Sequence, residues 1–179
     1  MKRNITIRDR GFTIIEILIV LAIAGLILTI VFIAVPQLQR NARDNQRQAM
    51  VARLKTELET FSANNQGQYP FLGANNFYSN CRTDFVGART CRDWLERYIQ
   101  NGNVNIKDPT TGQDIDVYIT INPTLPLSAW HIGAVWISVG NRCSGEQFAP
   151  GPGGGANSKS YAIAIALERN STYYCIDNG

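Results

Sequence analysis

The sequence predicts an α+β protein in which a long N-terminal helix, with a membrane-spanning first half, packs against a small antiparallel β-sheet head. Residues 12–35 form a run of 24 residues that contains one charge, Glu16. Helical periodicity continues from this run to about Asn64. The rest of the chain contains four short strand patterns and four cysteines.

The composition excludes several protein classes. The chain has 179 residues, of which 45% are hydrophobic and 17% charged, so it is not a collagen, a coiled coil or a fully disordered chain. The formal charge of +3 arises within the first eleven residues, from Lys2, Arg3, Arg8 and Arg10 against Asp9. The chain after Gly11 is formally neutral, and we expect no specific binding of nucleic acid.

The apolar run is long enough to cross a membrane. As a helix, residues 12–35 would extend about 36 Å, which covers a hydrocarbon core of about 30 Å. The hydrophobic region of a secretory signal is shorter and ends in a small-residue cleavage site. This run ends at Pro36, with Arg40 and Arg43 beyond it. These features favour a retained membrane segment.

Glu16 is the residue that a plain anchor does not explain. An ionised carboxylate in an apolar helix costs several kcal/mol unless a partner neutralises it. The alternative is that Glu16, five positions inside the run, lies at headgroup depth and is hydrated.

The order of residues around Glu16 resembles a known processing site. Basic residues are followed by Gly11, by Phe12-Thr13-Ile14-Ile15-Glu16 and by a long aliphatic stretch. This arrangement is similar to the processing site and N-terminal helix of type IV prepilins and the related pseudopilins. The resemblance covers about the first 60 residues. It implies the pilin fold and a leader, residues 1–11, that a membrane-embedded prepilin peptidase removes. Phe12 would then become N-methylphenylalanine.

The resemblance also suggests a partner for Glu16. Cleavage after Gly11 creates an amine on Phe12, four residues before the acid, which is about one helical turn. In the family, the acid is thought to meet the terminal amine of a neighbouring subunit, so that assembly neutralises both charges. A contact within one helix is the second possible pairing. The implied partners are copies of the chain itself, prepilin peptidase and the pilus assembly machinery of the cytoplasmic membrane.

Residues 36–65 are expected to continue the helix with one apolar face. This face would contain Leu38, Ala42, Ala49, Met50, Leu54, Leu58 and Phe61. A helix from Phe12 to Asn64 would be roughly 80 Å long, too long for one small domain to cover, so its first half must contact lipid or other subunits. Gly25 and Pro36 are the expected bends or melted turns.

The cysteines indicate the compartment. Cys81, Cys91, Cys143 and Cys175 all follow the apolar run, and an even number suits two disulfides in an oxidising, extracytoplasmic setting. We favour Cys81 with Cys91, which closes a local loop, and Cys143 with Cys175, which ties the C-terminal strand. A metal site is the alternative, although no pair has the Cys-x-x-Cys spacing and His131 is the one histidine.

Residues 66–179 are expected to form the globular head. We predict a short helix at 90–99 and strands at 114–121, 129–139, 161–168 and 171–176. A curled sheet packed on the amphipathic half of the long helix is the simplest arrangement, and the resemblance implies it too.

No catalytic constellation is present, and we expect neither an enzyme nor a cofactor. Residues 153–160 resemble a phosphate-binding loop but lead into a strand, and Ser158 replaces the second glycine. Asp108, Asp114 and Asp116 are a weak calcium candidate, because solvated turn and edge carboxylates explain them more simply. His131 lies in an apolar strand and is interpreted as structural.

The predicted function is that of a structural subunit of an extracellular type IV pilus. The subunit would be held in the cytoplasmic membrane as a single-pass prepilin with its head outside, cleaved after Gly11 and polymerised through its apolar helix. One alternative is a pseudopilin of a type II secretion system or a minor pilin for DNA uptake, because residues 107–112 resemble a pseudopilin loop. A monomeric, membrane-anchored adhesive or binding head is a further alternative.

Overall fold

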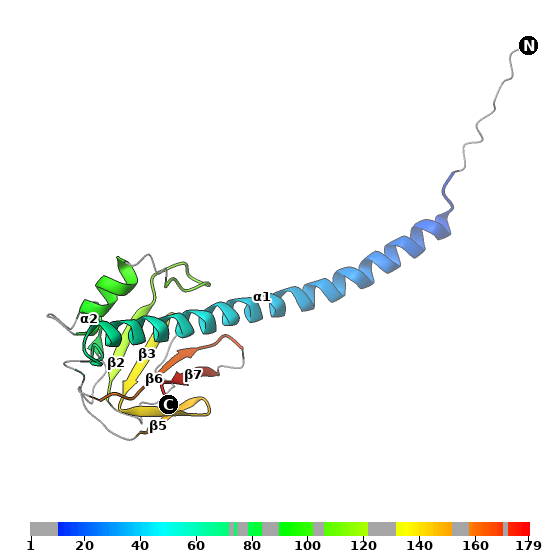
Figure 1. The fold of residues 1–179 in the computed structure, drawn as a ribbon. Coiled ribbons are helices and arrows are strands. Elements are labelled where there is room, and N and C mark those ends of the chain that lie inside the picture. Colours follow the sequence, from blue (N-terminus) through cyan, green and yellow to red (C-terminus); the bar gives the residue numbers. More distant parts are fainter. Residues whose placement is uncertain are drawn as a thin grey trace, which may run out of the picture. The chain divides into compact units, whose positions relative to one another are not determined.

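The computed structural model describes residues 11–71, 74, 79–83, 90–101, 106–121, 132–151, 158–169 and 172–179. It divides into two compact units, one ending at Gln39 and one formed by Arg40–Gly179. The described elements confirm the predicted class, because a long N-terminal helix is followed by a small, mostly antiparallel sheet (Figure 1).

Helix α1, Ile14–Asn64, is the longest element, with 51 residues. It ends where the sequence predicts, because Gln66 and Gly67 adopt the left-handed conformation, with φ of 60° and 76°. The N–H of Gly67 donates to the carbonyl of Ser62 at 2.8 Å and satisfies one of the last helical acceptors. Gly25 and Pro36 both lie within α1, and neither is a melted turn. The expected bends at these positions stay predictions.

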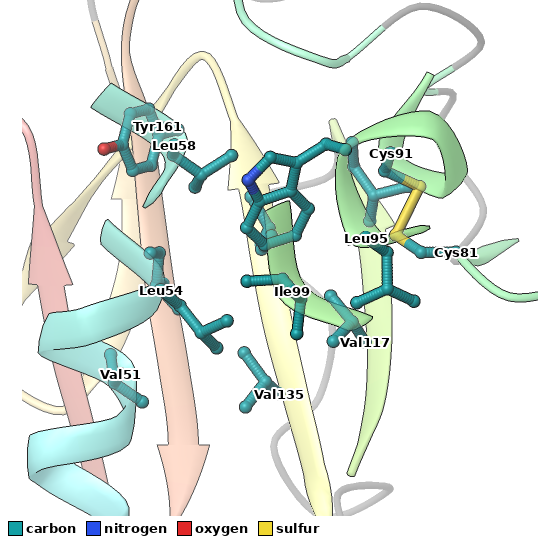
Figure 2. Close-up of a cluster of buried hydrophobic side chains, with 14 of the residues drawn as sticks. Val51, Leu54, Leu58, Cys81, Cys91, Leu95, Ile99, Val117, Val135 and Tyr161 are labelled. Carbon is teal, nitrogen blue, oxygen red and sulfur yellow. A yellow bond between two sulfur atoms is a disulfide. The ribbon is translucent and has the colours of Figure 1, made fainter. Parts of the chain in front are cut away.

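The second half of α1 packs on the sheet through one face. Val51, Leu54, Leu58 and Phe61 recur at three and four residues, and all are at most 1% exposed. Figure 2 shows Leu54 and Leu58 pointing toward the side chains of the sheet and of the short helical segment.

The N-terminal part of the predicted face is wrong. Leu38, Ala42 and Ala49 are exposed, whereas Arg47 and Asp44 are buried. The spacing of three and four residues, followed backward from Leu54 through Val51, arrives at these two charged residues. The pattern of apolar residues alone could not identify Asp44 and Arg47 as part of the buried face.

The main sheet has five strands in the order β1-β2-β3-β6-β7. They are β1 (Ser79–Asn80), β2 (Asp116–Thr120), β3 (Ala134–Val139), β6 (Tyr161–Ala166) and β7 (Tyr173–Asp177). Three of the four pairings are antiparallel, but β2 and β3 are parallel. The expectation of a wholly antiparallel sheet is therefore wrong at this pair. The connection of 13 residues, 121–133, has the length that a parallel crossover needs.

Both faces of the sheet are covered at its centre, because every residue of β3 and β6 is buried. Val135, Ile137, Ile163 and Ile165 face the core that α1 completes. The alternate residues face a second cluster, which is made up of Ala134, Trp136, Phe148, Ala162 and Ala164. Phe148 comes from a hairpin of β4 (Asn141–Ser144) and β5 (Gln147–Pro150), which the sequence analysis did not predict. The small alanines of β6 leave room for this hairpin.

The predicted short helix is present as α2 (Cys91–Trp94) followed by a π-helical segment, η1 (Leu95–Gln100). Thr90 caps α2 by accepting the N–H of Asp93 at 3.3 Å. Figure 2 shows the Cys81–Cys91 disulfide beside Leu95, where it joins α2 to the end of β1.

A second disulfide, Cys143–Cys175, joins the hairpin to β7, and all four cysteines are paired. The N–H of Cys143 also donates to the Asp177 carboxylate at 2.7 Å. Two contacts from the same segment therefore hold the hairpin on the outer face of the sheet.

If both pairs are disulfides in the purified protein, Cys143→Ser should loosen the hairpin and β7 and reduce the free energy of unfolding by about 2 to 5 kcal/mol. Denaturant unfolding of the full chain in detergent micelles measures this change. A thiol-specific alkylating reagent should leave the unreduced wild type unmodified. Extensive alkylation before reduction would contradict the pairing.

Candidate functional site

The N-terminal end of α1 holds the predicted processing and assembly residues. Gly11 and Phe12 lie just before the helix, and the leader residues 1–10 lie outside the described residues. The Glu16 carboxylate accepts the backbone N–H and the hydroxyl of Thr13, both at 2.8 Å. The Thr13 hydroxyl in turn accepts the N–H of Glu16 at 3.4 Å. This is a capping-box arrangement.

The sequence analysis included Thr13 in the processing motif but did not predict its contacts with Glu16. The pattern Thr-x-x-Glu at a helix start is the signal that could have found them. Thr13 supplies two neutral donors to Glu16, and among the described residues no cation lies within salt-bridge distance of this carboxylate. The acid is hydrogen-bonded but not neutralised.

The apolar segment that follows is exposed along nearly its whole length. Its most hydrophobic window of 18 residues has a mean hydropathy of 3.2 and no buried residue, and α1 is long and apolar enough to cross a membrane. Every large hydrophobic side chain from Phe12 to Val35 is at least 40% exposed. So large a contiguous apolar surface indicates a membrane or a partner.

A second polar centre lies on the buried face of α1, around the guanidinium of Arg47. Arg47 is 0% exposed and donates to Asp108 at 2.8 and 3.0 Å, to Glu168 at 3.0 Å and to Asp44 at 3.2 Å. Its fourth partner is the Thr110 hydroxyl at 2.7 Å. One buried cation therefore joins α1, the turn before β2 and the turn after β6.

The remaining contacts of this cluster complete its hydrogen bonding. Asp44 accepts the backbone N–H groups of Glu168 at 2.8 Å and of Arg169 at 3.0 Å. Arg43 forms a two-pronged pair with Glu168, at 2.5 and 2.8 Å. Thr110 donates its hydroxyl to Glu168 as well. Few polar atoms of the cluster are left to be hydrated.

The electrostatics of the cluster favour the charged carboxylates. The hydrogen bond from Arg43 outweighs the effect of burial on Glu168 and, with help from Thr110 and Arg47, lowers its pKa to about 2. Burial would raise the pKa of Asp108, but hydrogen bonds from Arg47 and the amides of Thr111 and Thr110 lower it.

A third polar contact lies at Glu59, about three helical turns beyond Arg47 on α1. Tyr161 and Tyr69 each donate a hydroxyl to the Glu59 carboxylate at 2.6 Å. Burial, and then the neighbouring Glu59, raises the pKa of both phenols, so they remain hydrogen-bond donors over the ordinary pH range. Between the two centres, Lys55 donates to the carbonyl of Asp177 at 2.6 Å.

The structure does not bring the calcium candidates together. Asp108 is buried against Arg47, Asp114 pairs with Arg82 at 3.4 Å, and Asp116 accepts from Asn80 at 3.2 Å. The interpretation of Asp108 as a solvated turn carboxylate is wrong, because an internal cation holds it inside. The described part of the chain contains no group of three His, Cys, Asp or Glu residues suited to a metal ion.

Two other predicted features fall mostly outside the described residues. His131 is not described, and of the phosphate-loop candidate only residues 158–160 are. In that part, the Ser158 hydroxyl and the N–H of Ser160 are hydrogen-bonded to each other at 3.2 Å.

Comparison with known protein families identifies the motif at the N-terminal end of the chain. Residues 7–32 match the model described as the prokaryotic N-terminal methylation motif. The chain carries that methylation motif. The match includes Gly11, Phe12, Thr13 and Glu16, and it confirms the resemblance to type IV prepilins and pseudopilins. No curated protein and no solved structure matched the chain.

The motif accounts for the exposed segment in general terms. The motif implies processing by prepilin peptidase, and the apolar helix suggests anchoring in a membrane. The Arg47 cluster lies outside the matched residues, so its role is derived from its contacts alone.

Substituting Arg47 tests how much the cluster contributes to the free energy of unfolding. Arg47→Met fills a similar volume but leaves Asp108 buried without its counter-ion, so we expect a loss of about 3 to 5 kcal/mol in the free energy of unfolding. Arg53→Met, at an exposed position of the same helix, should change it by less than about 0.5 kcal/mol. Denaturant unfolding in micelles provides both values. Equal effects of the two substitutions would contradict a buried ionic tie.

The cluster should also make stability depend on acid. The pKa of Glu168 falls from an ordinary 4.5 to about 2 in the folded protein. Its stabilisation is therefore complete above about pH 4.5 and is lost as the pH falls toward 2. The difference in unfolding free energy between wild type and Glu168→Gln should be largest at neutral pH and shrink over this window. A difference that stays constant down to pH 2 would contradict the assignment.

Proposed function

We propose that this chain is the structural subunit of a type IV pilus filament. The observation that carries the proposal is the exposed apolar helix that the methylation motif begins, in which Glu16 is the one charge between Phe12 and Val35. The first half of α1 holds the precursor in the cytoplasmic membrane. After cleavage behind Gly11, the same segment packs against other copies of the chain.

The exposed apolar segment of α1 needs lipid around it before assembly and other apolar helices around it afterwards. Burying each large aliphatic side chain contributes about 1.5 to 3 kcal/mol, so the segment is stable in lipid and unfavourable in water. A mature subunit leaves the membrane only if another apolar environment replaces the lipid. The equivalent helices of neighbouring subunits provide such an environment, which supports a homopolymer with the helices in its core.

Glu16 supplies the negative charge that an incoming subunit can neutralise. Thr13 supplies two donors, which lower the cost of holding the carboxylate in the membrane. They leave its negative charge in place, and a carboxylate accepts about four hydrogen bonds in total. The amine created on Phe12 of an incoming subunit supplies the missing cation. Pairing the two groups removes two charges that are costly in an apolar core.

The proposed role as a filament subunit divides the chain into four parts. Residues 1–11 are the leader, 12–35 the membrane and filament-core helix, 36–65 the amphipathic continuation and 66–179 the head. The disulfides Cys81–Cys91 and Cys143–Cys175 support a head that matures in an oxidising compartment, outside the cytoplasm.

The test replaces Glu16 as the sole copy in cells that assemble the filament. Glu16→Leu makes the helix more apolar, so membrane insertion and cleavage to Phe12 should persist, whereas the amount of filament sheared from cells should fall at least about tenfold, the effect of losing roughly 1.4 kcal/mol. Glu16→Gln keeps shape without charge and should show an intermediate defect. Glu57→Gln, which removes a carboxylate from the amphipathic continuation of the same helix, is the matched control and should assemble normally.

Electron microscopy and mass spectrometry of the sheared fraction separate the alternatives. Filaments built mainly from this chain support the proposal, and trace amounts within filaments of another subunit indicate a minor pilin. Protein that stays with the membranes in wild type and variant alike indicates an anchored binding head. Normal filament from Glu16→Leu would overturn the assembly role of the acid.

A further inference from the structure

Two exposed arginines lie in the second compact unit, Arg40–Gly179, which is called the head from here on. Arg40 is the first residue of the second unit, and Arg169 follows the turn after β6; both are exposed. Among the described residues neither side chain takes part in an ion pair. We call Arg40 and Arg169 the basic patch.

Asp44 holds the two arginines at the same end of the head. Its carboxylate binds the backbone N–H of Arg169 at 3.0 Å and that of Glu168 at 2.8 Å. Arg40 lies four residues before Asp44 on α1, which is about 6 Å along the helix axis. Asp44 therefore holds the backbone of Arg169 beside the turn of α1 that begins at Arg40, although the two arginines are 129 positions apart in the chain.

The charges at this end of the head are segregated by sign. The three acids of the Arg47 cluster are covered, because the side chains of Asp44, Asp108 and Glu168 are only 4%, 1% and 10% exposed. Each of them is paired with Arg47, and Glu168 is paired with Arg43 as well. Three acids face two cations, so the covered cluster keeps one net negative charge, whereas the exposed charges of Arg40 and Arg169 are both positive.

The position of the patch along the chain indicates what it meets. Leu38, at 65% exposed, is the last exposed large hydrophobic residue of α1, and Arg40 follows two residues later. Arg40 is five residues beyond Val35, about 7.5 Å of helix past the end of the apolar run. That distance corresponds to headgroup depth for a segment that spans the hydrocarbon core, and arginine side chains extend readily along such an interface.

We propose that Arg40 and Arg169 form a binding surface for anionic lipid headgroups on the side of the membrane where the head lies. The inference rests on the proposed membrane-held subunit. A guanidinium donates two parallel hydrogen bonds to a phosphate, so two such groups can hold neighbouring headgroups. The contact orients the head on the bilayer before assembly and is given up when the subunit leaves the membrane.

A nucleic acid fits this patch less well than a lipid. Affinity for nucleic acid rises with the number of phosphates that are neutralised, and two cations neutralise few. The chain after Gly11 has no net charge to add to them. At a membrane the apolar helix supplies the affinity, and the two arginines need only select the headgroup.

The test measures which lipids surround the full-length chain. The protein is reconstituted in phosphatidylcholine bilayers with spin-labelled phosphatidylglycerol or spin-labelled phosphatidylcholine, and electron spin resonance gives their relative association with the protein. Wild type should prefer phosphatidylglycerol. The double variant Arg40→Gln/Arg169→Gln should lose about fivefold of this preference per charge removed, because each cation near an anionic surface contributes about 1 kcal/mol. Molar salt should abolish the difference.

A matched variant controls for net charge. Arg53→Gln/Lys159→Gln removes two other exposed cations, and Arg53 lies 13 residues, about 20 Å, further along α1. This variant should keep the wild-type preference. The leader cations are present in every variant, so they do not affect the comparison. The side chain of Arg169 can be changed without disturbing the cluster, since Asp44 binds its backbone.

The outcomes separate this inference from the proposed function. Flotation with the vesicles in alkaline carbonate reports the membrane span, and a wild type that fails to float overturns the proposed function. A wild type that floats but shows no preference for phosphatidylglycerol, or whose preference survives in Arg40→Gln/Arg169→Gln, overturns the patch alone. The patch is also overturned if the double variant instead loses binding to duplex DNA with its lipid preference unchanged.

Discussion

The head depends on the neutralisation of one buried cation. Arg47 is on the face of α1 that packs on the sheet, and a guanidinium without counter-ions there would cost several kcal/mol. Its carboxylates come from α1 itself, from the turn before β2 and from the turn after β6. These segments must therefore meet at one point, which fixes the position of α1 along the sheet. The Glu59 contacts with Tyr69 and Tyr161 fix the other end in the same way.

Helix α1 thus satisfies two opposite requirements with one backbone conformation. In its first half, nothing within the most hydrophobic window is buried, and most side chains are aliphatic. In its second half, the buried face includes Asp44 and Arg47. The usual relation between polarity and burial is inverted in the first half, which exposes its apolar side chains, and at Asp44 and Arg47 in the second half, where an ionic cluster is buried beside an ordinary apolar face. The helix joins a surface that needs a partner to a surface that already has one.

The sequence predicts this organisation unevenly. Period and length were enough for α1 and its end at Asn64. Alternation was enough for β2 and β6, a longer apolar run at 129–139 contains β3, and the predicted strand 171–176 overlaps β7. Hydrophobic pattern could not find the cluster, since it scores Arg47 as a surface residue, and Asp108 gained its role only from contacts across the chain. The parallel pairing of β2 with β3 depends on the path of a connection that carries no local signal. The β4–β5 hairpin was missed because Arg142, Ser144 and Gln147 are polar and exposed, so that Phe148 is the one large apolar residue of its two strands.

Glu16 and Arg47 are two solutions to the same problem, and the difference between them indicates what each is for. Arg47 has three carboxylates and a hydroxyl within 3.2 Å, so its charge is balanced within one chain and nothing further has to bind. Glu16 has two neutral donors from Thr13 and, in the described part of the chain, no cation. A site that is hydrogen-bonded but still charged tolerates a polar interface and is penalised in an apolar core. The requirement for a counter-charge thus lies in the segment that matches the methylation motif, where the proposed cleavage would create a new amine, whereas Arg47 has its counter-charges within the second unit.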